Sequence, residues 1–378
     1  MKLTTAGESH GKALVAIIEG LPAHLKIDME KIDADLAYRQ SGYGRGARQK
    51  IEKDKAEILT GVRNGETLGS PVTMCIFNRD FANWENCMGA GACDETLMKK
   101  KSLTKVRPGH ADLTGVIKFE QTDARNILER ASARETAIRV AVGGIYKQYL
   151  SAFGVEIAGY VKEVCGIKDG GMYAFNELSK AKTTPVGMMD AEAEKLAEEK
   201  IAQLKKEGDT AGGVVEIRVK GLKSGFGSMM TYAEKLDAKL AQGLMSIQAI
   251  KGVEVGEGFA VGEKSGKWVH DEIFYGENGF YRETNRAGGI EGGMSNGEEI
   301  VLRVAMKPIP TLMKGLQTVD YNTKEIVTAA SERSDVCAIF ALEIIAEAVV
   351  AQVLADVVNA RLGGDTMRQQ TERYALLP

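Results

Sequence analysis

Two histidines in glycine-flanked motifs are the residues of this chain whose types and spacing best suit proton transfer. His10 lies in Gly-Glu-Ser-His-Gly at residues 7–11, and His110 lies in Arg-Pro-Gly-His-Ala-Asp at residues 107–112. Histidine can both give and take a proton near neutral pH. The sequence therefore predicts acid–base chemistry. The alternative for either histidine taken alone is a loop residue that only caps backbone groups. The other two histidines lie in ordinary polar contexts and receive no role: His24 and His270.

Arginines gather around these motifs. Arg39, Arg45 and Arg48 follow the first motif in a glycine-broken stretch, and Arg107 opens the second. Guanidinium groups suit phosphate and carboxylate oxygens. A small, multiply anionic substrate is therefore expected.

A third motif, Glu-Arg-Ala-Ser-Ala-Arg-Glu-Thr at residues 129–136, carries two more arginines. Arg130 and Arg134 are four residues apart, which predicts that they share one helix face. Ser132 lies between them. Salt bridges to the neighbouring glutamates are the alternative interpretation.

The C-terminal half contributes a ten-residue glycine-rich loop at 288–297. It is not a Walker A loop, because it lacks the Lys-Ser/Thr after the glycines. No Gly-x-Gly-x-x-Gly follows a strand, so a Rossmann nucleotide site has no support. A Lys-Pro-Ile-Pro-Thr stretch at 307–311 and an Arg-Ser-Asp at 333–335 follow. The latter precedes the last long helix, where anions are favoured.

Composition excludes several classes of protein. Of 378 residues, 44% are hydrophobic and 27% charged, as in soluble globular proteins, and the net charge of −3 gives no reason to expect nucleic acid or a membrane. No apolar run is long enough for a membrane span, and the N-terminus lacks a signal-peptide core. Five cysteines without a Cys-x-x-Cys pair make a disulfide framework or a zinc site improbable, so we expect a cytoplasmic protein.

Hydrophobic patterning predicts strands and long buried helices in an order without βαβα alternation. Strands are expected at 13–18, 51–62, 70–77, 154–165, 213–221, 253–261 and 299–305. Helices are expected at 28–38, 123–150 (interrupted at Gly143-Gly144), 190–206, 232–249 and 338–360, and a long loop at 79–106. This order predicts an α+β fold. Since no linker divides the chain, we expect a single domain over 1–378.

Taken together, the motifs resemble those of the chorismate synthase family. The match rests on residues 7–11, 107–112, 129–136, 292–297, 307–311 and 333–337 and runs from residue 3 to about 360. The resemblance implies a β-α-β sandwich with helices between two antiparallel sheets, assembled as a homotetramer. It also implies a 1,4-trans elimination of phosphate from 5-enolpyruvylshikimate 3-phosphate to give chorismate. The reaction requires reduced flavin mononucleotide (FMN) without net redox change.

The resemblance also implies roles for individual residues. His10 would protonate the departing phosphate, His110 would protonate the reduced flavin near its N1, and Asp335 would help move the ring proton. Substrate-binding positions would be Arg39, Arg45, Arg48, Arg107 and Arg134. Flavin-binding positions would be Arg130, Ala131, Ser132, Gln248, Ala249, Gly292, Lys307, Pro308, Ile309, Pro310, Thr311 and Arg333.

Some points stay open in the sequence. The family places nicotinamide-nucleotide contacts at Arg39 and Arg45, although their charge suits the substrate equally well. NADPH as the reductant and an outside reductase are both possible. Gln248 stands where the family has Asn, and Gly227-Ser228-Met229 replaces its Gly-Ser-Pro. The rival functions are another phosphate-handling enzyme, disfavoured by the absent Walker A loop, and an RNA-binding module, disfavoured by the net charge.

Overall fold

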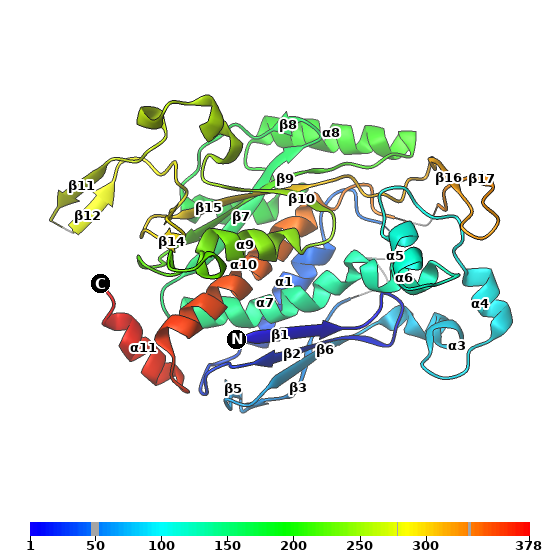
Figure 1. The fold of residues 1–378 in the computed structure, drawn as a ribbon, viewed down its shortest axis with the longest axis horizontal. Coiled ribbons are helices and arrows are strands. Elements are labelled where there is room, and N and C mark those ends of the chain that lie inside the picture. Colours follow the sequence, from blue (N-terminus) through cyan, green and yellow to red (C-terminus); the bar gives the residue numbers. More distant parts are fainter. Residues whose placement is uncertain (47–52, 278, 332–333) are drawn as a thin grey trace.

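Two antiparallel β-sheets enclose a layer of helices in the computed structural model, which describes residues 1–46, 53–277, 279–331 and 334–378 (Figure 1). The strands of the sheets are β1 (Lys2–Ala6), β2 (Ala13–Glu19), β3 (Glu57–Thr60), β6 (Val72–Phe77), β7 (Glu156–Val164), β8 (Ile167–Lys168), β9 (Gly213–Lys220), β10 (Ile250–Val255) and β15 (Ile300–Met306). One sheet has the order β1-β2-β6-β3 and the other the order β10-β15-β9-β7-β8. The predicted α+β sandwich is confirmed.

Each sheet turns one face to the helices, as alternation along the strands requires. In β15, Ile300, Leu302 and Val304 are fully buried, whereas the residues between them are partly exposed. In β2, Leu14 and Ile18 are likewise fully buried. The helical layer therefore receives apolar side chains from both sides.

Three long helices form the centre of this layer: α1 (Met29–Gln40), α7 (Thr136–Ser151) and α10 (Ile339–Leu362). Helix α7 contacts β2 and β6 of one sheet, and α10 contacts β7 and β9 of the other. The two helices also pack closely on each other. A Cβ added at Gly143 of α7 would lie 2.3 Å from the Cβ of Ala348, so only glycine permits this approach.

The remaining helices lie around this centre. They are α3 (Glu85–Met88), α4 (Glu95–Lys101), α5 (Asp112–Lys118), α6 (Arg125–Ala131), α8 (Ala191–Glu207), α9 (Leu236–Met245) and α11 (Met367–Ala375). None of the helices among the described residues combines the length and apolar character needed to cross a bilayer.

Two expectations about helices are wrong. The segment 79–106 is not one long loop, because it contains a 3-10 helix at Arg79–Asn83 followed by α3 and α4. The expected helix at 123–150 is three elements: α6, a 3-10 turn at Ala133–Glu135, and α7. Ser132 breaks it, since its extended backbone (ψ 140°) stops α6 and its hydroxyl accepts the N–H of Arg134. Gly143 and Gly144 lie inside α7 without interrupting it.

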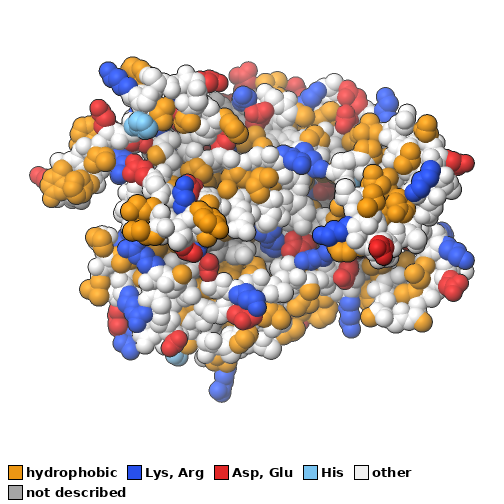
Figure 2. Space-filling view, viewed as in Figure 1, with side chains coloured by type: hydrophobic (Ala, Val, Ile, Leu, Met, Phe, Trp, Pro, Cys, Tyr) orange, Lys and Arg blue, Asp and Glu red, His pale blue; other side chains and the backbone are white. Residues whose placement is uncertain are grey.

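A hairpin of β11 (Ile273–Gly276) and β12 (Gly279–Arg282) projects from the body, at the left in Figure 1. Figure 2 shows hydrophobic side chains gathered at its tip. Shorter pairs complete the strand inventory: β4 (Val62–Arg63) with β5 (Glu66–Thr67), β13 (Ile290–Glu291) with β14 (Met294–Ser295), and β16 (Gln317–Val319) with β17 (Ile326–Thr328).

Candidate active site

The loop that carries His10 is fixed by the glutamate that opens the third motif. One carboxylate oxygen of Glu129 accepts the backbone N–H of His10 at 2.7 Å, and the other lies 2.9 Å from the imidazole Nδ1. The Glu129 carbonyl accepts the N–H of Ser9 at 2.9 Å. Since Glu129 is in α6 and is buried, this helix holds both the backbone and the ring of the loop histidine.

The carboxyl of Glu129 is ionised at neutral pH. Burial alone raises its pKa, but the hydrogen bonds and charge of His10 and the nearby Arg125 outweigh burial and lower the pKa below its usual value. Arg125 lies one helical turn before Glu129, with a 3.5 Å ion pair between them.

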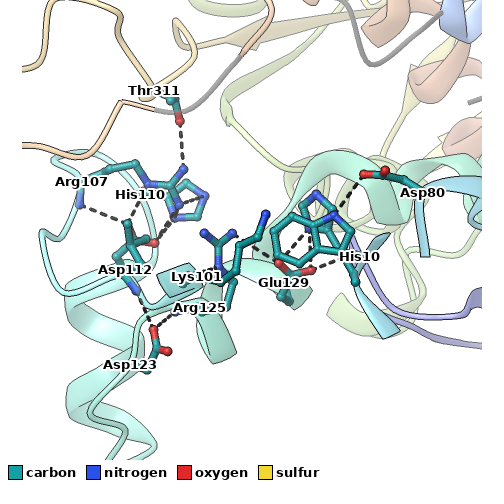
Figure 3. A network of polar contacts seen from close by, with 12 residues as sticks. His10, Asp80, Lys101, Arg107, His110, Asp112, Asp123, Arg125, Glu129 and Thr311 are labelled. Carbon is teal, nitrogen blue, oxygen red and sulfur yellow. Dashed lines mark hydrogen bonds and ion pairs between the residues drawn. The ribbon is translucent and has the colours of Figure 1, made fainter. Parts of the chain in front are cut away.

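The segment 79–101 contributes side chains that cover His10. The Trp84 ring stacks on the imidazole with 4.0 Å between centroids, and the Lys101 ammonium lies 4.0 Å from the Trp84 centroid. The indole N–H of Trp84 donates to Asp80. Figure 3 shows Lys101 and Arg125 between His10 and His110 in this view. The segment expected as a loop is therefore part of the site.

His110 is held in a similar way at the start of α5. Its Nδ1 lies 2.5 Å from the Asp112 carboxylate, which also accepts two hydrogen bonds from the Arg107 guanidinium, at 2.8 and 3.0 Å. Arg107 also donates to the Thr311 hydroxyl at 3.0 Å. Burial would raise the pKa of Asp112, but hydrogen bonds from His110 and Arg107 lower it well below its usual range. Both imidazoles therefore contact an ionised, buried carboxylate, and the helices that carry these carboxylates, α5 and α6, contact each other.

Arg134 and Arg39 form a buried group beside the His10 loop. Arg134 pairs with Asp54 at 2.6 Å, and Arg39 donates to the Thr136 hydroxyl and to a backbone carbonyl. Burial lowers the pKa of Arg39, Asp54 opposes this, and the guanidinium of Arg134 lowers it further. Because all these donors of Arg39 bond to the protein, this side chain supports its neighbours from within the fold.

Asp335 lies near the same group. Its carboxylate pairs with Arg45 at 2.9 Å and accepts the backbone N–H of Gly46 at 2.6 Å. Arg45 is almost fully buried, whereas Asp335 is partly exposed. Arg48 and Arg333, which were also predicted as site residues, lie outside the described residues.

Asn78 joins the His10 loop to Arg134. Its amide nitrogen donates to the carbonyls of Glu8 and Gly11, at 3.2 and 2.7 Å, and its amide oxygen accepts two hydrogen bonds from Arg134, at 3.0 and 2.9 Å. Asn78 is buried. One amide therefore sets the position of a predicted acid relative to a predicted anion-binding group.

Arg130 and Arg134 do not share a helix face, contrary to expectation. Helix α6 ends at Ala131, and Ser132 turns the chain, so the two arginines point to different partners. Arg130 is half-exposed and donates to the backbone carbonyls of Gly7 and Thr5. It therefore lies against the His10 loop, apart from the Arg134 cluster.

Of the remaining predicted flavin positions, two segments contact each other, and Gly292 lies on a third segment that is not shown to contact them. The Lys307 backbone N–H donates to the Ala249 carbonyl, and the Lys307 ammonium bonds to the Gly109 carbonyl, beside His110. This places the residues 307–311 next to both Gln248-Ala249 and the second histidine motif. Gly292, with φ of 57°, forms the turn between β13 and β14.

Gln248 presents an unsatisfied acceptor. Its amide nitrogen donates to Glu135 at 3.3 Å, but its buried Oε1 has no hydrogen-bond partner among the described residues. A buried polar atom of this kind calls for a ligand or water donor. Within the same described ranges, no group of three His, Cys, Asp or Glu residues could hold a metal ion.

Sequence reasoning missed several residues of the site. Glu129 and Asp112 lie inside motifs that were singled out. For Asp112 its place two residues after His110 was the available signal, whereas only the tertiary fold brings Glu129 to His10. Asp54, Asn78 and Trp84 carry no local signal, because only the tertiary fold brings them to the site.

Comparison with known proteins gives a consistent result. A family model described as chorismate synthase matches residues 1–358. Chorismate synthase of Geobacter sulfurreducens is 53% identical over 386 residues, covering 99% of this chain and 97% of the relative. That of Alkaliphilus metalliredigens is 52% identical, covering 97% of each. A crystal structure of chorismate synthase matches with a TM-score of 0.78 and 37% identity, covering 99% of this chain and 96% of the other.

Proposed function

The chain belongs to the chorismate synthase family, and we propose that it converts 5-enolpyruvylshikimate 3-phosphate to chorismate by a 1,4-trans elimination of phosphate. The observation that carries this proposal is the pair of imidazoles, each bonded to a buried carboxylate, beside buried guanidinium groups. A substrate with one phosphate and two carboxylates suits such a site.

His10 acts as the general acid that protonates the departing phosphate. Asp335 accepts the ring hydrogen as a proton, and the paired Arg45 keeps that carboxylate in place. Arg45, Arg48, Arg107 and Arg134 bind the substrate anions. We assign Arg39 a supporting role, since its donors bond to Thr136 and a backbone carbonyl.

The residues present fit reduced FMN as the cofactor. The orphaned Oε1 of Gln248 is an acceptor, and reduced flavin carries N–H donors. When bound, reduced FMN supplies electron density to the substrate, with no net redox change. The residues that would hold it are Arg130, Ala131, Ser132, Gln248, Ala249, Gly292, Lys307, Pro308, Ile309, Pro310, Thr311 and Arg333. His110 holds a proton at the edge of this site.

An anaerobic assay tests the proposal. We expect the purified protein to release chorismate and phosphate in equal amounts when given the substrate and chemically reduced FMN. Phosphate release without chorismate, or turnover that does not need reduced FMN, would contradict it. Omitting FMN is the control.

We propose that neither Arg39 nor Arg45 binds NADPH, because both are buried in contacts within the protein. The reduced flavin then comes from an outside reductase. Aerobic turnover with NADPH and FMN as the only additions would overturn this assignment.

We further propose that the chain acts as a cytoplasmic homotetramer. The projecting β11–β12 hairpin supports assembly, since it exposes Ile273, Tyr275 and Phe280 to solvent. An exposed apolar group of this kind marks a contact between proteins.

A further inference from the structure

The Glu129 carboxylate contacts the His10 residue at two places that together fix the ring. Oε2 accepts the backbone N–H at 2.7 Å, and the two oxygens lie 2.9 and 3.1 Å from Nδ1. Glu129 is only 2% exposed, so water does not compete for these bonds. The ring and its backbone are therefore held by one rigid group on a helix.

An ionised carboxylate only accepts hydrogen bonds, so the nitrogen facing it must carry a proton. That nitrogen is Nδ1. Among the described residues, none forms a hydrogen bond with Nε2 of His10. Trp84 stacks on the face of the ring and makes no hydrogen bond to it. Nε2 is thus the ring atom left for a ligand.

We propose that Glu129 is a positioning residue that holds the His10 imidazole with Nδ1 protonated, so that the proton reaching the departing phosphate leaves from Nε2. The N–H bond at Nε2 breaks, an O–H bond forms on the phosphate, and the neutral ring keeps its Nδ1 proton on Glu129. That the proton goes to the phosphate rests on the proposed function. That Glu129 fixes the ring with Nδ1 protonated does not depend on it.

The second imidazole shows the same arrangement, with Asp112 at Nδ1 of His110. Asp112 is the less informative residue to change, because it also accepts three hydrogen bonds from Arg107, one from the backbone and two from the guanidinium. Removing its charge would release Arg107 as well. For Glu129 the corresponding complication is smaller, namely the 3.5 Å ion pair with Arg125.

The test uses Glu129→Gln, which keeps the shape of the side chain but replaces one acceptor oxygen by an N–H donor. Either the backbone N–H or Nδ1–H of His10 then faces a donor, and the ring is free to adopt the Nε2–H form. We expect kcat to fall about 10²- to 10³-fold, the range for a misplaced or wrongly protonated catalytic histidine, with KM changed less than about 3-fold.

Glu194→Gln is the matched control. Glu194 is also a buried glutamate that accepts two backbone N–H groups, from Val186 and Met188, but it lies in α8, and neither of these partners belongs to the active site. We expect its kcat to equal that of the wild type. A Glu129→Gln variant with wild-type kcat, or with a loss matched by Glu194→Gln, would overturn the proposal.

A second measurement does not depend on turnover or on the folding of the Glu129→Gln variant. Nitrogen-15 NMR of the histidine side chains, recorded on wild-type protein without substrate or flavin and assigned with His10→Asn, is expected to show a protonated Nδ1 on His10. A neutral ring protonated only at Nε2 would overturn the hold by Glu129. Wild-type protein that forms no chorismate would instead overturn the proposed function, and the NMR signal would still decide the state of the ring.

Discussion

Asn78 shows how much of the site depends on single side chains to which we assign no contact with substrate or cofactor. Its amide uses its donors on one side, at the Glu8 and Gly11 carbonyls, and its acceptor on the other, at Arg134. No other type of side chain of this size offers both donors and an acceptor at one end. A predicted acid and a predicted anion-binding group therefore keep their separation through one residue.

Asn78→Asp separates these two functions. The carboxylate still accepts from Arg134 but can no longer donate to the two carbonyls, so the His10 loop loses its support. We expect kcat to fall about 10- to 100-fold, as for a small misplacement of a catalytic group, with KM little changed. Steady-state kinetics under anaerobic conditions with reduced FMN would measure both. The control is Asn176→Asp, an exposed asparagine outside the site. Equal losses in the two variants would contradict the argument.

His110→Ala tests the second imidazole. Because Asp112 holds this ring in place, its removal deletes a positioned proton donor, and turnover is expected to slow about 10- to 10³-fold. His24→Ala serves for comparison, since His24 is an exposed histidine whose ring bonds to Glu66, outside the site. Unchanged turnover of His110→Ala with saturating reduced flavin would remove His110 from the chemistry.

The sequence predicted the groups that do chemistry better than the groups that hold them. His10 and His110 stand out because histidine is rare in this chain and both lie in glycine-flanked motifs. Asp54 and Trp84 could not be found in this way, since each reaches the site only through long-range packing against Arg134 or His10. Arg130 was placed on the wrong face because a single extended residue, Ser132, ended the helix.

At the scale of elements, the strongly patterned segments were predictable. The strand at 13–18 and the helix at 338–360 appear as β2 and α10 with ends within two residues, because burial on one face or on all faces leaves a clear pattern in the sequence. The helices of the segment 79–106 were not predictable, because α3 and α4 are short and exposed and neither has a buried residue. Its place over His10 comes from the stacking of Trp84.

Helix α10 carries a buried charged group that the chemistry does not use. Glu343 and Glu347 lie one turn apart, near Lys147 of α7 and Lys182. Burial, followed by the charge of Glu347, raises the pKa of Glu343 well above its usual value. For Glu347, burial is outweighed by Lys147 and Lys182, which lower the pKa. Of the two, Glu343 therefore keeps its proton to the higher pH, and Glu347 is the one that carries the charge.

This difference predicts a pH-dependent effect of Glu343→Gln on stability. The unfolded chain releases the Glu343 proton above a pH of about 4.3 while the folded chain retains it, so this residue costs the wild type up to about 1.4 kcal/mol of stability for each pH unit above that value. Glutamine mimics the neutral acid and removes this cost. We expect the free energy of unfolding of the variant, relative to wild type, to rise from pH 5 to pH 7 in urea denaturation. A difference that stays constant with pH would contradict the protonated state.

At the scale of the whole molecule, the β11–β12 hairpin is hard to explain in an isolated chain. Tyr275 lies opposite Phe280 on one face, and Phe274 stacks on Tyr281 on the other, so the hairpin is apolar on both faces. A two-stranded hairpin is marginal in water on its own. Its extension from the body, seen in Figures 1 and 2, leaves these side chains without cover in the single chain. A second copy of the chain is the cover that we propose.

Tyr275→Ser combined with Phe280→Ser therefore tests the assembly. The two side chains are 74% and 77% exposed in the single chain, so their loss should leave the fold of the subunit intact and remove apolar area from a contact between copies. We expect light scattering to give a smaller mass for the double variant than for the wild type, with an unchanged circular dichroism spectrum. Met172→Ser is the control, because Met172 is 97% exposed but lies outside the hairpin. An unchanged mass would mean that the hairpin does not hold copies together, and any tetramer would then have to form through another surface.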